Sequence, residues 1–205
     1  MELLECYLPV FKRVTEMISD PQQFTDYEQS RQGCTDVLEQ AHQSASLQDV
    51  SEDEKEASHL AVVAWLDESI LRSGLPWRQH WQGELLQRKY LQITVAGERF
   101  FTRLAQLEPS QQQAHEVFLF CLQNGFQGQY STDDDMPALQ AVIGEQRSLC
   151  LPEEWLHWPN DAAITPSEPS QPVVPTFRKS PYLRMAIGIS LLYGMLFFIL
   201  YHYVA

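Results

Sequence analysis

Apolar residues recur at intervals of three and four over most of the first 150 residues, which is the period of amphipathic helices. Leu4, Leu8, Phe11 and Val14 show this spacing near the start of the chain. The same period returns in six later segments, and only the short stretch Leu91–Val95 resembles a strand. The pattern predicts an all-α fold, a bundle of about seven helices, over residues 3–18, 21–45, 52–72, 77–90, 97–107, 111–123 and 133–150.

Helix start signals refine these boundaries. Asp20 followed by Pro21 combines a capping side chain with a proline suited to the first helical position, so we expect the second helix to begin there. Ser51 and Glu54 have the spacing of a capping box, which predicts the start of the third helix. One face of the predicted fourth helix is apolar and consists of Trp77, Trp81 and Leu85.

The end of the chain has a different pattern. Met185–Val204 contains no Asp, Glu, Lys or Arg. A helix of about 20 residues is about 30 Å long, which matches the hydrocarbon core of a bilayer. The segment is apolar on all sides, unlike a helix that covers a soluble core, and tyrosines at 182, 201 and 203 suit the two interfaces. We therefore predict a transmembrane helix over residues 182–204.

The residues before this helix indicate its orientation. Arg178, Lys179 and Arg184 flank it on the N-terminal side and no basic residue follows it, so the positive-inside rule places the N-terminal domain in the cytoplasm. Pro159–Pro175 contains five prolines and reads as an extended tether. The expected organisation is a cytoplasmic helical domain over residues 1–158, a Pro-rich tether over 159–181 and the transmembrane helix over 182–204.

Charge and composition exclude several functions. All 27 acidic residues precede Arg178, together with 11 of the 14 basic ones, so this part has a net charge of −16. Such a domain is a poor partner for nucleic acid, whose phosphates need Lys and Arg. The four cysteines and six histidines follow no metal-ligand spacing, and no phosphate loop or nucleophile motif is present. We predict no metal, no cofactor and no enzymatic activity.

Asp67 and Glu68 lie on the predicted third helix, where Asp67 falls on an apolar stripe. A buried carboxylate is costly unless it is hydrogen-bonded, so Asp67 is expected to bind a neighbouring helix terminus or an arginine such as Arg88 or Arg99. The alternative is that Asp67 and Glu68 bind a partner protein, and the two roles can coexist if Glu68 faces a groove. Adjacent helical residues diverge by about 100°, which disfavours an acid/base pair on one substrate.

Asn124–Tyr130 has the composition of a turn between helices. Gly125 suits the left-handed position after a helix, and Gly128 permits a second sharp bend. Phe126 and Tyr130 are expected to hold the turn against the core. Taken alone, the segment predicts a rigid connection and no binding site.

Four segments in this order resemble the DotU/IcmH family of secretion proteins: residues 62–71, 77–90, 97–107 and 116–130. The family pattern has an "LDE" helix, a "G-x-[KR]-F-F" helix start and a "GF-x-G-x-Y" turn, which match Leu66–Glu68, Gly97–Phe101 and Gly125–Tyr130. Many relatives have a tryptophan and a second glycine where this chain has Val95 and Ala96, so the loop before the second motif is expected to differ.

The resemblance implies a cytoplasmic hook of two small helical bundles, held at the bacterial inner membrane by one span. It also implies a structural role in a type VI secretion system, with an IcmF-like membrane protein (TssM), indirectly with an outer-membrane lipoprotein (TssJ), and with baseplate subunits. Homodimerisation is expected. Some relatives continue into a peptidoglycan-binding domain, whereas this sequence stops at Ala205, so cell-wall anchoring is expected from another protein.

Three alternatives remain open at this point. The related type IVb system also uses a DotU-like subunit, although a short chain with a C-terminal anchor favours type VI. A membrane-tethered hydrolase that uses Asp67 and Glu68 is a hypothesis from a different class. The third alternative is a tail-anchored adaptor outside secretion.

Overall fold

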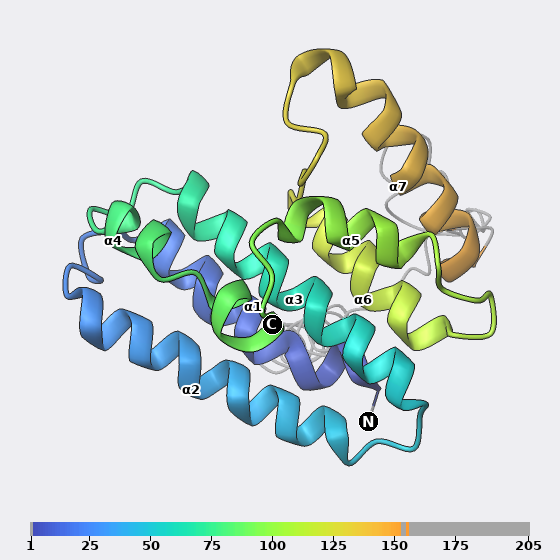
Figure 1. The fold of residues 1–205 in the computed structure, drawn as a ribbon, viewed down its shortest axis with the longest axis horizontal. Helices are drawn as coiled ribbons and strands as arrows, with labels where there is room; N and C mark the ends of the chain where they lie inside the picture. Colours follow the sequence, from blue (N-terminus) through green and yellow to red (C-terminus); the bar gives the residue numbers. More distant parts are fainter. Residues whose placement is uncertain (1, 153–154, 156–205) are drawn as a thin grey trace, which may run out of the picture. The chain divides into compact units, whose positions relative to one another are not determined.

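The computed structural model of the chain describes residues 2–152 and residue 155, and this part is helical with no strand (Figure 1). The prediction of an all-α domain is therefore confirmed, and the strand-like stretch Leu91–Val95 forms no strand. The elements are α1 (Leu3–Ser19), α2 (Tyr27–Ser46), α3 (Glu52–Arg72), α4 (Arg78–Gly83), the π-helical turn η1 (Gln87–Leu91), α5 (Ala96–Leu104), α6 (Gln112–Gln123), the 3-10 turn η2 (Asp133–Asp135) and α7 (Met136–Cys150).

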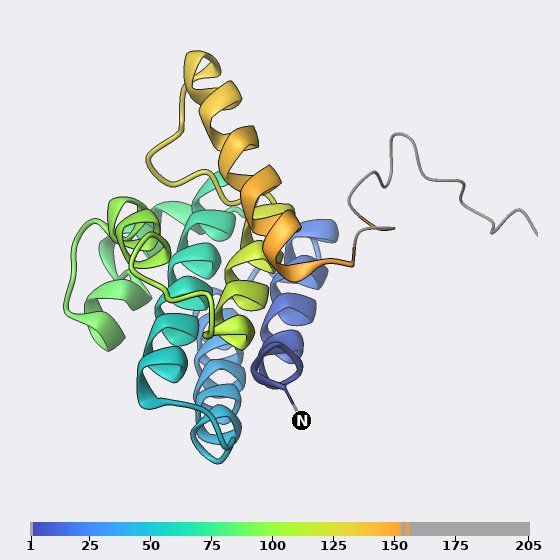
Figure 2. The same ribbon diagram turned by 90° about the vertical axis from the view of Figure 1, so that its right-hand side faces the viewer.

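Helix α3 is the centre of the fold. It contacts α1, α2, α4, η1, α5 and α6, and Figure 2 shows it surrounded by other helices. A helix that is covered on most sides must be apolar around most of its circumference, and α3 buries apolar residues from Ala57 to Ile70. Ser51 caps this helix as predicted, because its hydroxyl accepts a hydrogen bond from the Glu54 amide at 3.2 Å.

The predicted start of the second helix at Pro21 is wrong. Residues 21–23 form a turn, and α2 begins at Tyr27. The Asp20 carboxylate accepts a hydrogen bond from the side chain of Gln23, whereas the Asp26 carboxylate accepts one from the backbone amide of Gln29 at 2.9 Å. Asp26 therefore supplies the cap that starts the helix.

The predicted fourth helix over residues 77–90 is also wrong as one continuous element. Helix α4 ends at Gly83, and a separate π-helical turn begins at Gln87. Of the three residues expected to share a face of this helix, only Trp81 lies within α4; Trp77 precedes it and Leu85 follows it. The break has a cause in α3, because Asp67 binds the backbone amides at the start of the second piece, as described below.

The described residues all belong to the first of the chain's two units, Met1–Ala162, which we call the helical unit. The predicted tether over 159–181, the transmembrane helix over 182–204 and the basic residues Arg178, Lys179 and Arg184 lie outside the described residues. Among the helices that the structure does describe, none has the length and apolarity needed to cross a bilayer. The hook of two small bundles stays a prediction.

A buried histidine makes the stability of the first unit dependent on pH. His59 in α3 is 8% exposed, and its ring centroid lies 4.2 Å from that of His42 in α2. Its Nδ1 atom is buried without a hydrogen-bond partner in the described part of the chain. Burial, with a smaller contribution from His42, lowers the pKa of His59 from 6.5 to about 4.

We expect acidification to destabilise this unit through His59. Between pH 6.5 and about 4 the unfolded chain binds a proton at His59 that the folded chain does not bind. The free energy of unfolding therefore has its full value above pH 6.5 and is lower by about 2 kcal/mol at pH 5. Urea unfolding at pH 7 and pH 5 measures this loss, which should be smaller by that amount in His59→Gln. The exposed His80→Gln serves as a control, and equal pH dependence in wild type and His59→Gln would contradict the assignment.

Candidate functional site

The carboxylate of Asp67 is buried and fully hydrogen-bonded. Its side chain is 3% exposed. Oδ1 accepts from Trp81 Nε1 at 2.8 Å and from the Leu86 amide at 3.0 Å, and Oδ2 accepts from the Gln87 amide at 2.8 Å. Burial raises the pKa of the Asp67 carboxyl above its usual value, and the three N–H donors act in the opposite direction.

Asp67 therefore binds a helix terminus, which was one of the two internal partners expected from the sequence. The arginines suggested as alternatives are not its hydrogen-bond partners: Arg88 donates to the Gly83 carbonyl, and Arg99 lines a pocket with His42 and His59. Because the Asp67 side chain accepts hydrogen bonds from the amides of Leu86 and Gln87, α4 does not continue into η1. Asp67 thus acts as the capping residue of η1, although it lies on α3.

Glu68, the next residue, holds the turn after α6. Its Oε1 accepts from the Gln127 amide at 2.8 Å, and its Oε2 accepts from the Gly128 amide at 2.9 Å. Arg72, one turn further along α3, donates to Glu68 Oε1 at 3.2 Å and to the Gly125 carbonyl at 3.0 Å. Glu68 thus binds two backbone amides of this turn, and Arg72 binds one of its carbonyl groups.

The two adjacent carboxylates therefore serve two different loops. Their divergence by about 100° around the helix axis directs one toward residues 81–87 and the other toward residues 127–128. Both oxygens of each carboxylate accept hydrogen bonds from internal N–H groups. This geometry does not provide a free base or nucleophile at either position, and the prediction that these residues bind a partner directly stays untested.

The turn over residues 125–130 packs onto α5 through aromatic rings. Gly125 has a φ of +89° and Gly128 a φ of +54°, which are conformations that favour glycine. Phe126 is 2% exposed, with its ring centroid 4.2 Å from that of Phe100. Tyr130 makes an edge contact with Phe101 at 4.7 Å between centroids. The turn is thereby fixed on the first two aromatic residues of α5.

A close approach of two glycines was not foreseen from the sequence. A Cβ atom placed on Gly97 would lie 3.0 Å from the Cα of Gly128, and one on Gly128 would lie 2.9 Å from the carbonyl oxygen of Gly97. The start of α5 and the turn after α6 thus touch backbone to backbone. The available signal was the presence of glycine in both motifs, which is informative only when the two motifs are known to be neighbours.

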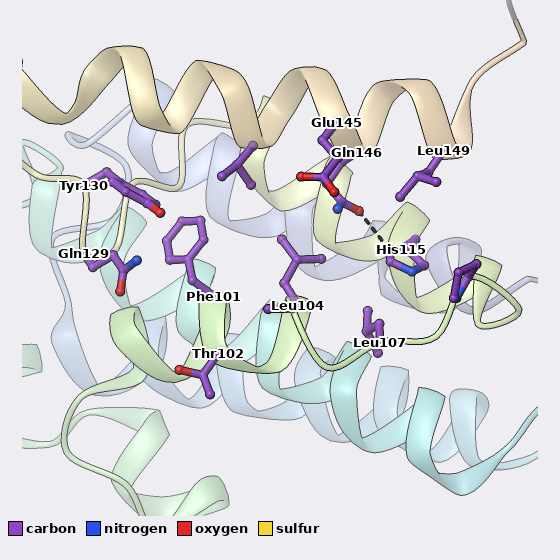
Figure 3. A pocket seen from close by; sticks show the side chains of 13 residues that line it. Phe101, Thr102, Leu104, Leu107, His115, Gln129, Tyr130, Glu145, Gln146 and Leu149 are labelled. Carbon is purple, nitrogen blue, oxygen red and sulfur yellow. Dashed lines mark hydrogen bonds between the residues drawn. The ribbon is translucent and has the colours of Figure 1, made fainter.

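A pocket of about 640 Å³ lies beside this turn, between α5 and α7 (Figure 3). We call it the α5–α7 pocket. His115 of α6 lies in it, with Nδ1 2.8 Å from Gln146 Oε1 of α7 and Nε2 3.2 Å from the Glu108 carbonyl. Its other lining residues include Phe101, Thr102 and Leu104 of α5, Gln129 and Tyr130 of the turn, and Val142, Glu145 and Leu149 of α7. The sequence predicted a groove near Asp67 and Glu68, and neither of these residues lines this pocket.

Comparisons with known proteins test the resemblance that the motifs indicated. A family model described as "Type VI secretion system protein DotU" matches residues 2–204. The chain belongs to the DotU family. This confirms the resemblance found in the three motifs, and Glu68, Gly97 and Gly128 of this DotU protein are the residues that join those motifs in space. A comparison with curated proteins gives no match.

Two solved structures have the same fold as this DotU protein. The cytoplasmic domain of TssL from Acinetobacter baumannii is 26% identical, with a TM-score of 0.62, and the match covers 73% of this chain and 96% of that one. A crystal structure of TssL from Vibrio cholerae is 23% identical, also with a TM-score of 0.62, over 72% of this chain and 94% of that one. The helical unit is therefore similar to the TssL cytoplasmic domain in both fold and extent.

We expect Glu68→Gln to loosen the turn of this DotU protein. A glutamine side chain has one acceptor oxygen for two backbone donors, so one buried hydrogen bond is lost at a cost of about 1 to 2 kcal/mol. Amide exchange in residues 125–130, followed by mass spectrometry, should be faster by about tenfold. Glu98→Gln, an exposed change in the first turn of α5, should leave exchange unaltered. Unchanged exchange in Glu68→Gln would show that the turn does not depend on this carboxylate.

Proposed function

We propose that the chain is a structural subunit of the type VI secretion inner-membrane complex, with its helical unit in the cytoplasm. In this role it links the envelope-spanning channel, built with an IcmF-like protein, to the cytoplasmic baseplate. The observation that carries the proposal is the family match over residues 2–204, which extends through the apolar segment near the C-terminus. The similarity of the helical unit to a TssL cytoplasmic domain supports the same side of the membrane.

A structural role also agrees with how the polar residues of the two motifs are used. Asp67 and Glu68 accept six hydrogen bonds, all from donors within the helical unit: Arg72, Trp81, Leu86, Gln87, Gln127 and Gly128. The hydrolase hypothesis needs at least one of these carboxylates to reach a substrate. The geometry favours the alternative, in which both residues fix the shape of a protein surface.

Deletion of residues 181–205 tests the proposal. We expect the full-length chain to be found in the inner-membrane fraction and to co-purify in detergent with the IcmF-like protein. The deletion variant should leave the membrane fraction, and its co-purification should weaken, because the segment supplies the anchor. The matched control replaces the deleted segment with an unrelated apolar sequence of equal length. It should restore membrane attachment.

The results separate the parts of the proposal. A deletion variant that stays in the membrane fraction would contradict the anchor. A full-length chain digested by protease added to the periplasmic side of spheroplasts would contradict the cytoplasmic location. Undiminished co-purification after the deletion would remove residues 181–205 from the contact with the IcmF-like protein.

A further inference from the structure

The α5–α7 pocket has the composition of a protein-binding surface. Its α5 wall includes the apolar residues Phe101 and Leu104 beside Thr102, and its α7 wall includes Val142 and Leu149. Leu149 of α7 is 50% exposed, although it is a large apolar residue and other residues of α7 are buried. Apolar side chains that converge from two helices on an open pocket are typical of a site for a partner helix.

The charge around the pocket indicates what kind of helix fits. Among the residues that line the pocket, Glu145 is the one acidic side chain, and no lysine or arginine is present. The segment that forms α6, the turn and α7, residues 108–152, carries six acidic residues and one basic residue, Arg147. Glu145 itself lines the pocket, and Arg147 donates to the carbonyl of Trp155. On α5, Arg103 forms an ion pair with Asp53, and Arg99 lines a different pocket. An occupant with Lys and Arg beside its apolar residues complements this surface, whereas an acidic one is repelled.

The size of the pocket limits the contact. Val142 and Leu149 are seven positions apart on α7, which corresponds to about 10 Å along the helix axis, or two helical turns. Two turns of an amphipathic helix present about three apolar side chains on one face. The pocket thus suits a short helical segment and is too small for the face of a whole domain.

The position of the wall depends on Glu68. Gln129 and Tyr130 line the pocket and directly follow Gln127 and Gly128, whose amides Glu68 binds. Tyr130 is further held by its edge contact with Phe101. Glu68 is thus a positioning residue for the pocket, acting through the turn and not through contact with an occupant.

We propose that the α5–α7 pocket docks a basic amphipathic helix of a cytoplasmic partner protein, with apolar side chains inserted between α5 and α7. The inference rests on the proposed function, since a scaffold on the cytoplasmic side must bind other proteins, and it adds the location and the chemistry of one contact. Glu145, within an acidic segment of the chain, sets the orientation and the rate of encounter of the helix, and the apolar walls provide most of the affinity.

Site-specific photo-crosslinking in the full-length chain tests this inference. A photoreactive residue replaces Thr102, which is exposed and lines the pocket, in cells that produce the whole secretion apparatus. A second variant carries it at Leu149 on the opposite wall, in case the first position perturbs the pocket. A third carries it at Gln43, exposed on α2, as a control. The crosslinked peptides are identified by mass spectrometry.

We expect the first two positions to crosslink to one partner segment with net positive charge and apolar residues spaced by three and four, and Gln43 not to do so. The change Glu145→Lys should reduce that crosslink by about fivefold, because it reverses the charge at the rim. The same change at Glu28 on α2, which is exposed, should leave it unaltered. Both variants should remain in the membrane fraction with the IcmF-like protein.

Several results would overturn the inference. They are a crosslink to residues 153–205 of the same chain, to a second copy, to lipid, or to an acidic or uncharged segment, and the absence of any crosslink. If these occur while the chain remains in the membrane with its IcmF-like partner, the pocket assignment fails and the proposed function stands. If the chain is absent from the membrane fraction, the proposed function itself fails.

Discussion

Asp67→Ala is expected to lower the free energy of unfolding of the helical unit by about 3 to 5 kcal/mol. Within residues 2–152, the substitution removes the one acceptor of Trp81 Nε1 and of the amides of Leu86 and Gln87. Trp81 and Leu86 are fully buried, so water cannot easily replace the carboxylate. A loss of this size is a large part of the stability of an ordinary domain. Urea unfolding of residues 1–162, followed by circular dichroism, measures it.

The conservative change and a matched control make the result specific. Asp67→Asn keeps the volume but places an amide N–H against a backbone donor, so we expect about half of the loss seen with alanine. Asp36→Ala removes an exposed aspartate from α2 and should change the stability by less than about 0.5 kcal/mol. If Asp67→Ala costs no more than Asp36→Ala, the carboxylate is not what joins α3 to the residues after α4.

The helix starts show where sequence reasoning works and where it stops. Ser51 could be identified as a cap because its partner, Glu54, lies three residues away. The choice between Asp20 and Asp26 could not be made in this way. The intervening loop is held by distant groups: Trp77 Nε1 donates to the Phe24 carbonyl at 2.6 Å, and the Arg13 guanidinium lies 4.9 Å from the centroid of the Phe24 ring. These contacts depend on the fold, and no local pattern contains them.

The candidate site shows the same division. The sequence indicated that Asp67 needs an internal partner, because a carboxylate on an apolar stripe requires one. It could not identify Trp81, Leu86 and Gln87, since periodicity describes one helix at a time. Glu68 acts on residues about 60 positions further along the chain. Each of the three motifs could be recognised in the sequence. Their contacts could not, because Glu68 of the first motif binds Gly128 of the third, and Gly128 touches Gly97 of the second, only in the folded chain.

Gly128→Ala is expected to lower the free energy of unfolding by about 2 to 4 kcal/mol, for two reasons that act together. An L-residue at its φ of +54° costs about 1 kcal/mol, and the added Cβ would lie 2.9 Å from the Gly97 carbonyl oxygen and from Phe101 Cε2. Forcing an extra methyl group into such a contact costs a further 1 to 3 kcal/mol, roughly. The measurement is again urea unfolding of residues 1–162.

Two other glycines separate the two causes. Gly125 has a φ of +89° with no atom within 4 Å of an added Cβ, so Gly125→Ala should cost about 1 kcal/mol through the backbone alone. Gly97 lies in α5, where an added Cβ would meet the Gly128 Cα at 3.0 Å, so Gly97→Ala tests the contact without the cost of a positive φ, although the higher helix propensity of alanine offsets part of the loss. Gly128→Ala should exceed each of them. If it costs no more than Gly125→Ala, the backbone contact between the second and third motifs does not contribute to stability, and the ring contacts of Phe126 and Tyr130 hold the turn against α5.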